Sequence, residues 1–179
     1  MKPNNFLSAL LAILSALVCN AAQAQAKPDF KYPDNIKTTA LVDIKKAEGS
    51  GDKMLLLDAV IRYSLAESMT STDNAPKVFD TIEKYRKAET APDFAALYTL
   101  LEAKAYAAYR DCTNVRRAQK HETLPDDITE WSFADFSDKI SQLVAIALSD
   151  KTALKNTPTS RFRKVLNYKE EYLKFYPTL

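Results

Sequence analysis

Apolar residues recur every three or four positions along much of the chain, which is the spacing of one face of an α-helix. The first such stretch spans residues 34–48, and its recurring apolar positions are Ile36, Leu41, Ile44 and Ala47. Gly49 follows directly and is expected to end this helix, because glycine readily takes the left-handed conformation found just after a helix. A second helix is predicted over 52–69, where Asp52 can cap the first turn.

Proline marks the starts of two further predicted helices. Asn74 and Pro76 can open a third helix, whose inward-facing positions are Val78, Ile82 and Tyr85. Thr90 and Pro92 can open a fourth helix, and its apolar seam consists of Phe94, Leu97, Leu101, Ala105 and Ala108. Side chains become smaller along this seam, which would allow a neighbouring helix to approach closely.

The periodicity fails over residues 112–124, which we interpret as a long connection. Arg116 and Arg117 lie within it, and two adjacent guanidinium groups could bind a carboxylate or another domain; a solvated turn is the alternative. A fifth helix is predicted to follow, running to about residue 149, and its start has the pattern of a capping box with a hydrophobic staple. Trp131, Ser132 and Phe136 are therefore predicted as the structural anchor of this junction, with Asp135 completing the box.

The last residues concentrate aromatic side chains near the end of the chain. Short helical turns are predicted over 152–155 and 160–166, on either side of Pro158. The aromatic and apolar residues beyond them are Tyr168, Tyr172, Leu173, Phe175, Tyr176 and Leu179. Because chain ends fray unless they are docked, we expect 167–179 to be a truncated link that rests against further domains. Tyr172, Phe175 and Tyr176 join Arg116 and Arg117 as candidate residues for docking a partner.

These elements predict an all-α fold. Helices of about 15 to 20 residues joined by short turns favour antiparallel hairpins, arranged either as a bundle or as a short repeat-like superhelix. No repeat period is evident, so both arrangements stay open. Strands are not predicted, because β-branched residues do not cluster in alternating runs. The chain also has only two glycines, which leaves few candidate turns for a sheet. We predict one helical domain over 27–166, followed by the 167–179 segment.

Residues 1–26 have the three parts of a secretory signal peptide. Lys2 precedes an apolar run over 6–18, and small residues that permit cleavage follow it up to Ala26. The run is shorter than the roughly 20 residues of a membrane span. We therefore expect export to the periplasm or the cell surface and no membrane span. A lipid anchor at Cys19 is the alternative, although Val18 is branched where a small residue is expected.

Charge and cysteine content narrow the possible chemistry. The formal net charge is +2, with both signs spread along the chain, so nucleic acid is not an expected partner. Only Cys112 remains once residues 1–26 are removed, so no internal disulfide can form. We expect its thiol to be free and packed as a small apolar group. A nucleophilic pair of Cys112 with His121, the only histidine, lacks any orienting motif, and we expect a surface histidine.

The sequence contains no metal or cofactor motif. Asp126, Asp127 and Glu130 lack the alternating ligands and central glycine of a calcium loop. They are expected to lie before a helix, where its dipole favours acidic groups. The chain has no GxGxxG, P-loop, HExxH or CxxC motif. We therefore expect no catalytic, cofactor or metal site and no enzyme activity.

One stretch resembles a known family. The sequence Leu-Pro-Asp-Asp-Ile-Thr-Glu-Trp over 124–131, followed by an apolar helix over 133–148, is similar to the helical N-terminal region of large exported bacterial alpha-2-macroglobulin-like proteins. In that region an Asp-Ile-x-x-Trp step leads into a helix. A Leu-x-x-x-Pro stretch follows, here 154–158, and later a Pro-Thr-Leu element, here 177–179. The resemblance is clearest over 123–179 and weaker over 38–111.

The resemblance implies a function without catalysis in these residues. Such proteins trap or inhibit proteases through a thioester or a bait region in later domains. The implied role is a helical N-terminal module that docks on later domains of the same polypeptide or on envelope proteins, and that engages proteases only indirectly. The alternative is a free-standing periplasmic helical-repeat adaptor, which would bind protein or peptide segments between its hairpins.

Overall fold

The structure is a computed structural model that describes residues 33–113, 115, 119–166, 173–174 and 176–179. The predicted signal peptide over 1–26 lies outside these residues. The described part forms six α-helices, which are α2 (Pro33–Ser50), α3 (Lys53–Thr70), α4 (Ala75–Ala88), α5 (Pro92–Cys112), α6 (Phe133–Ala147) and α7 (Lys151–Asn156). The described part also has three short 3₁₀ helices: η2 (Thr72–Asn74) between α3 and α4, η3 (Ile128–Glu130) between α5 and α6, and η4 (Thr159–Phe162) after α7. The predicted all-α fold is confirmed, since the described residues form no strand beyond one isolated bridge.

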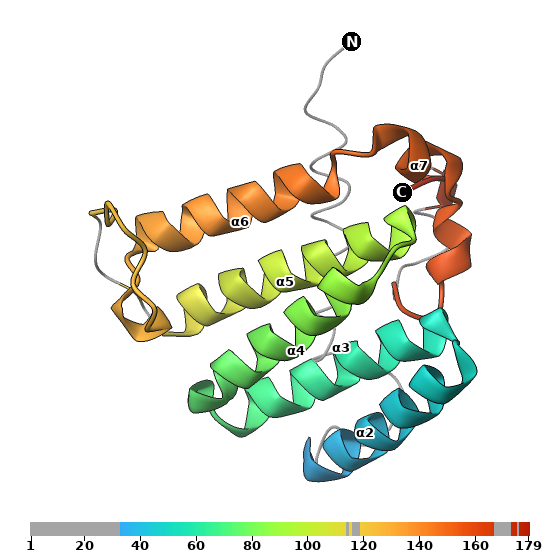
Figure 1. The fold of residues 1–179 in the computed structure, drawn as a ribbon, viewed down its shortest axis with the longest axis horizontal. Helices are drawn as coiled ribbons and strands as arrows, with labels where there is room; N and C mark the ends of the chain where they lie inside the picture. Colours follow the sequence, from blue (N-terminus) through green and yellow to red (C-terminus); the bar gives the residue numbers. More distant parts are fainter. Residues whose placement is uncertain (1–32, 114, 116–118, 167–172, 175) are drawn as a thin grey trace.

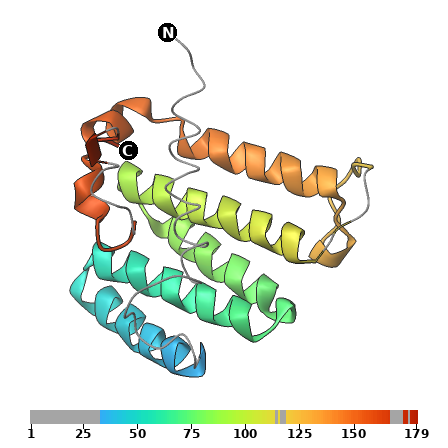
Figure 2. The same cartoon turned by 180° about the vertical axis from the view of Figure 1, so that it is seen from behind.

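The long helices lie side by side in the order in which they occur in the chain (Figure 1). Helices α2 to α6 alternate in direction, and each packs mainly on its neighbours in sequence, while α5 also contacts α3 and α7. The view from behind shows the same order, with α2 and α6 on the outside (Figure 2). The fold is therefore a series of antiparallel hairpins, with α7 and η4 at the end of the array that also holds the α2–α3 and α4–α5 turns.

The turn between α2 and α3 lies two residues later than predicted. Helix α2 continues through Gly49 to Ser50, and Gly51 is the residue with a positive φ, of 70°. Its N–H donates to the carbonyl of Ala47 at 2.8 Å, which closes the last turn of α2. Asp52 then caps α3 as expected, accepting hydrogen bonds from the backbone N–H groups of two residues in its first turn.

The starts of α4 and α5 also differ from the predicted caps. The Asn74 side chain makes no capping hydrogen bond; its Nδ2 donates instead to the carbonyl of Glu67 at 3.5 Å. Helix α5 is preceded by Ala91, and the N–H groups of Thr90 and Ala91 donate to the Glu89 side chain at 2.8 and 2.7 Å. The Glu89 carboxylate, one residue before Thr90, thus binds the N–H groups just ahead of α5, where a start at Thr90 was expected from the sequence.

Two apolar clusters hold the array together. The first core contains residues from α2 to α5, the last residue of α6 and residues of the chain after it, and its largest fully buried members are Tyr98, Phe162, Leu57, Ile82 and Leu179. The second core lies between α4, α5 and α6, and it consists of Ala75, Phe79, Ala103, Tyr106, Trp131, Phe136 and Leu143. Helix α5 contributes to both, which explains why more of it is buried than the single seam predicted.

The end of the chain packs on the first core. The Leu179 side chain is only 2% exposed, and its N–H donates to the carbonyl of Thr157 at 3.0 Å. Tyr176 is partly buried against the same cluster. We expected the segment to rest against further domains, but at Tyr176 and Leu179 the apolar surface packs on the helical domain itself.

Candidate functional site

The junction between the long connection and α6 is built around Trp131. Its ring stacks on Tyr106 with 5.6 Å between centroids, and it lies 5.1 Å from the Phe136 ring. Its indole Nε1–H donates to the carbonyl of Pro125 at 2.7 Å. Phe79 stacks on the far side of Tyr106 at 4.2 Å. Three stacked rings from α4, α5 and the start of α6 thus join these elements, and burial raises the pKa of Tyr106 to about 12.

Directly after Trp131 in the chain, Ser132 and Asp135 form the capping box expected from the sequence. The backbone N–H of Asp135 donates to Ser132 Oγ at 3.1 Å, and the N–H of Ser132 donates to Asp135 Oδ2 at 2.8 Å. Trp131, Ser132 and Phe136 are all buried. The box therefore fixes where α6 begins while Trp131 and Phe136 bury apolar surface on either side of it.

Asp135 has a second partner that the sequence did not indicate. The backbone N–H of His121 donates to Asp135 Oδ1 at 3.0 Å, and the His121 ring Nδ1 lies 2.6 Å from Oδ2. Burial alone would raise the pKa of Asp135, but the hydrogen bonds from His121 and Ser132 hold that pKa well below its usual 3.8. His121 was expected as a plain surface residue; it instead holds the long connection against the start of α6.

The predicted docking residues are only partly described. Arg116, Arg117, Tyr172 and Phe175 lie outside the described residues, so their placement stays a prediction. Tyr176 is described, and it packs partly against the first core. It is the only one of the five that the structure locates, and its side chain is partly buried within the domain.

Buried carboxylates link the helices to one another. Four of them pair with a cation on a different element: Glu67 with Lys37, Glu89 with Lys53, Asp93 with Arg161, and Glu102 with Arg86. Asp135 instead contacts the His121 ring. The distance is 2.6 Å for the first pair, which joins α3 to α2, and 2.5 Å for the Arg86–Glu102 pair, which joins α4 to α5. These charges hold neighbouring helices in register, because removing one partner would leave a buried charge without compensation.

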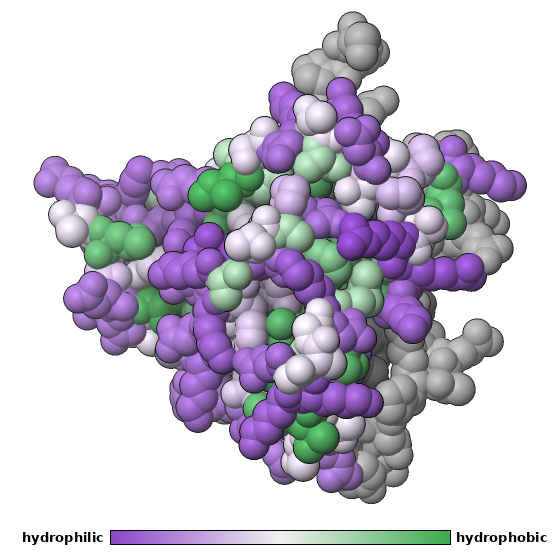
Figure 3. Space-filling model, turned by 45° about the vertical axis from the view of Figure 1, so that its right-hand side comes forward, coloured by the Kyte–Doolittle hydropathy of each residue, from purple (hydrophilic) through white to green (hydrophobic). Residues whose placement is uncertain are grey.

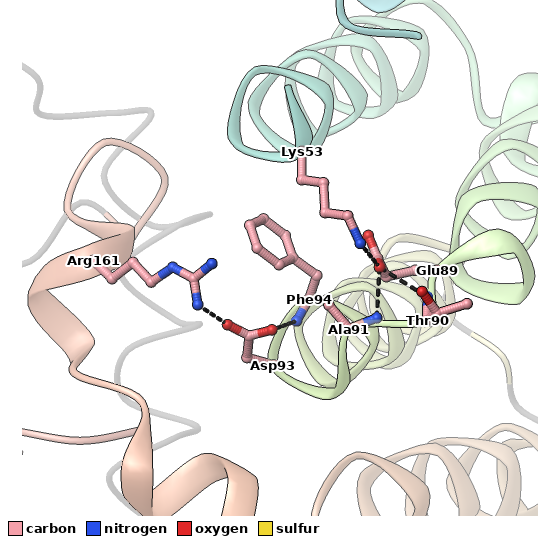
Figure 4. A network of polar contacts seen from close by, with 7 residues as sticks. All are labelled: Lys53, Glu89, Thr90, Ala91, Asp93, Phe94 and Arg161. Atoms are coloured by element: carbon pink, nitrogen blue, oxygen red, sulfur yellow. Dashed lines mark hydrogen bonds and ion pairs between the residues drawn. The ribbon is translucent and has the colours of Figure 1, made fainter. Parts of the chain in front are cut away.

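Two of these pairs lie together at the end of the array (Figure 4). Lys53, at the start of α3, reaches Glu89 in the α4–α5 turn at 2.5 Å. Asp93, in the first turn of α5, accepts the N–H of Phe94 at 3.0 Å and also pairs with Arg161 of η4. The Arg161 guanidinium lies 5.2 Å from the centroid of the Phe94 ring. This polar cluster ties α3, the α4–α5 turn and η4 to one another.

The exposed apolar surface is dispersed. On the face shown in Figure 3, apolar side chains form small separate patches among hydrophilic ones. The large apolar residues that are exposed in the described part are Leu41, Val42, Met69, Leu124, Phe133 and Ile146. Leu41 and Val42 lie on α2, and Phe133 and Ile146 lie on α6. Most of this surface thus belongs to the two outer helices.

The residues that were considered for catalysis or metal binding either have structural roles or lie exposed in the described part of the chain. Asp127 accepts hydrogen bonds from the N–H and hydroxyl of Thr129, both at 2.8 Å, and so caps η3. The part of the chain that the structure describes contains no group of three or more His, Cys, Asp or Glu side chains that could hold a metal ion. Cys112 is exposed, contrary to the expectation of a packed thiol, because it lies in the last turn of α5 beyond the cores. Among the described helices, none is both long and apolar enough to span a membrane.

Comparison with known proteins finds no match for this chain. No protein-family model, curated protein or solved structure matches the chain. Neither the alpha-2-macroglobulin-like resemblance nor any other family is established by similarity.

Proposed function

We propose that the chain is a non-catalytic helical module of an exported alpha-2-macroglobulin-like protein, which docks on later domains of that polypeptide or on envelope partners. The observation that carries the proposal is that the buried carboxylates of the domain are paired with side chains on other elements of the fold. Glu67, Glu89, Asp93, Glu102 and Asp135 each pair with another element of the fold. Such pairs favour a fixed register between helices, which suits a rigid docking platform.

The resemblance and the exposed surface support the same role. The stretch over 124–131, which carries the resemblance to the family, leads into the buried junction at Trp131 and Ser132. The residues of this stretch therefore serve to maintain the fold. Four of the six exposed large apolar residues in the described part lie on the outer helices α2 and α6, where another domain could cover them. Export would follow from residues 1–26, and N-terminal sequencing of the protein recovered from the periplasm would test cleavage after Ala24 or Ala26.

The first experiment is to read the open reading frame beyond the codon for Leu179. Continuation into β-sandwich domains supports the proposal. Binding of residues 27–179 to the next domain should then be measured by calorimetry, with Arg116→Ala/Arg117→Ala as the test variant. Lys155→Ala, an exposed cation on α7, is the matched control. A weakened affinity in the double variant alone is expected. Equal affinity in all three proteins would remove the two arginines from the interface.

A free-standing periplasmic adaptor is the second candidate. The packing of Tyr176 and Leu179 on the first core favours it, because this apolar surface needs no further domain to cover it. The array of antiparallel hairpins is also the architecture of many peptide-binding proteins. A stop codon directly after Leu179, together with saturable binding of extended peptides, would favour the adaptor over the docking module.

A further inference from the structure

Helix α2 presents one full face to solvent. It packs on α3 through Ala40, Ile44 and Ala47, which are all buried. On the opposite side, Val42 is 61% exposed, the highest value among the exposed large apolar residues of the described part, and Leu41 is 41% exposed. The outer face of α2 therefore carries apolar surface that stays exposed in the part of the chain that the structure describes.

Charges on the flanks of α2 are already paired within the chain. Lys37 lies 2.6 Å from Glu67, and Asp43 lies 2.7 Å from Arg62, so both join α2 to α3. Glu48 accepts a hydrogen bond from the Tyr85 hydroxyl at 2.9 Å and so reaches α4. These side chains point towards the rest of the domain and are not available to a partner.

The outward charges of α2 are different. Asp34, Lys45 and Lys46 are all exposed, and no ion pair joins them to another residue of the described part. Along the outer face the order is thus acidic at the start, apolar around Leu41 and Val42, and basic near the end. Such a face is complementary to a copy of itself turned end to end.

We propose that the outer face of α2 binds the same face of a second copy of this chain, as an antiparallel helix pair with twofold symmetry. Asp34 of each copy then lies opposite Lys45 and Lys46 of the other, and the Leu41 and Val42 side chains meet near the axis. Asp34 and Lys46 lie equally far from position 40, about 9 Å along the helix on either side, so both charge contacts form in one register. A parallel pair would instead place the lysines of both copies together, which is unfavourable.

The expected association is weak and depends on salt. One helix face about 27 Å long buries less than the roughly 1,600 Å² of a standard interface. A dissociation constant on the order of 100 µM is expected. Exposed charge pairs are screened as ionic strength rises, so salt should weaken the dimer. The pairing does not depend on the docking role proposed above, because it uses only the α2 face.

Sedimentation of the exported chain from about 10 µM to about 1 mM tests the pairing. A monomer–dimer equilibrium is expected, and Asp34→Lys should raise its dissociation constant at least about tenfold. Mixing that variant with Lys45→Glu/Lys46→Glu should restore dimerisation as a heterodimer, which a folding defect could not produce. Val42→Asp should abolish dimers, whereas Ile146→Asp, which changes an exposed apolar residue of α6, is the control and should not.

Several outcomes would overturn the proposal. They are a wild-type chain that stays monomeric at the highest concentration, a dimer insensitive to Asp34→Lys, or a dimer lost equally in the Ile146→Asp control. Binding of a later domain through Val42, with no self-association, would assign the face to that domain and would equally refute the pairing. Circular dichroism of each variant confirms that the helices are intact before the comparison is made.

Discussion

Replacing Trp131 with alanine should destabilise the fold by about 3 to 5 kcal/mol. The side chain is 7% exposed and lies in the second core, against the Tyr106 and Phe136 rings. Alanine would leave a cavity in a place where three elements meet. The surrounding structure could relax only in part, because Tyr106 is also stacked on Phe79.

The magnitude follows from the separate interactions that are lost. Truncation of a buried tryptophan costs about 3 to 5 kcal/mol in general, and each aromatic pair accounts for about 0.5 to 1.5 kcal/mol of it. The indole hydrogen bond to the carbonyl of Pro125 accounts for about 0.5 to 1.5 kcal/mol. A domain of this size has only about 5 to 15 kcal/mol of stability, so the variant should be close to its unfolding threshold.

Urea unfolding followed by far-ultraviolet circular dichroism is the suitable assay. Trp131 is the only tryptophan, so fluorescence is lost in the variant. Trp131→Phe keeps most of the apolar surface but loses the indole hydrogen bond, and it should cost about 1 to 2 kcal/mol. Phe133→Ala, at an exposed aromatic two positions along the chain, should cost less than about 1 kcal/mol. A loss below about 1 kcal/mol in Trp131→Ala would refute the assigned anchor.

Three further predictions concern charge and the chain end. The carboxylate of Asp135, with its lowered pKa, stabilises the fold above about pH 4. This contribution should decline progressively as pH falls below about 4 towards the lowered pKa of the folded state, and Asp135→Asn should flatten the slope of stability against pH in that range. Arg86→Met leaves the buried Glu102 unpaired and should lower the free energy of unfolding by about 3 to 5 kcal/mol. The double variant Arg86→Met/Glu102→Leu should recover most of this loss, and an equal loss in both variants would contradict the explanation. The amide of Leu179, bonded to the carbonyl of Thr157, should exchange slowly with solvent by NMR, and exchange at the rate of an unfolded peptide would show that the end is not docked.

Local patterns predicted helices and most of their boundaries. Asp52, the Ser132–Asp135 capping box and the Trp131–Phe136 contact all depend on residues within five positions of one another, so the sequence alone contains the geometry. Errors arose where two local solutions compete. Either Gly49 or Gly51 could end α2, and only the backbone conformation of the complete turn distinguishes them.

Long-range pairs could not be derived in the same way. Arg161 and Asp93 are 68 positions apart, and His121 and Asp135 are joined across an aperiodic connection, so no spacing rule places them together. One clue was present in the sequence. Glu102 interrupts an apolar stretch of α5, and a charge in such a position commonly needs a buried partner. Which cation would serve, however, depends on how α4 and α5 pack.

The order of the helices has a consequence for how the chain folds. Because each long helix packs mainly on the next one in sequence, most contacts form between residues that are close along the chain, and such topologies fold quickly. The contacts of the last segment are different. The Arg161–Asp93 pair closes a loop of 68 positions, for which the entropy cost is larger than for any hairpin. We therefore expect the hairpins to form as soon as their residues are available, and the chain end to close over η4 as a separate, slower step.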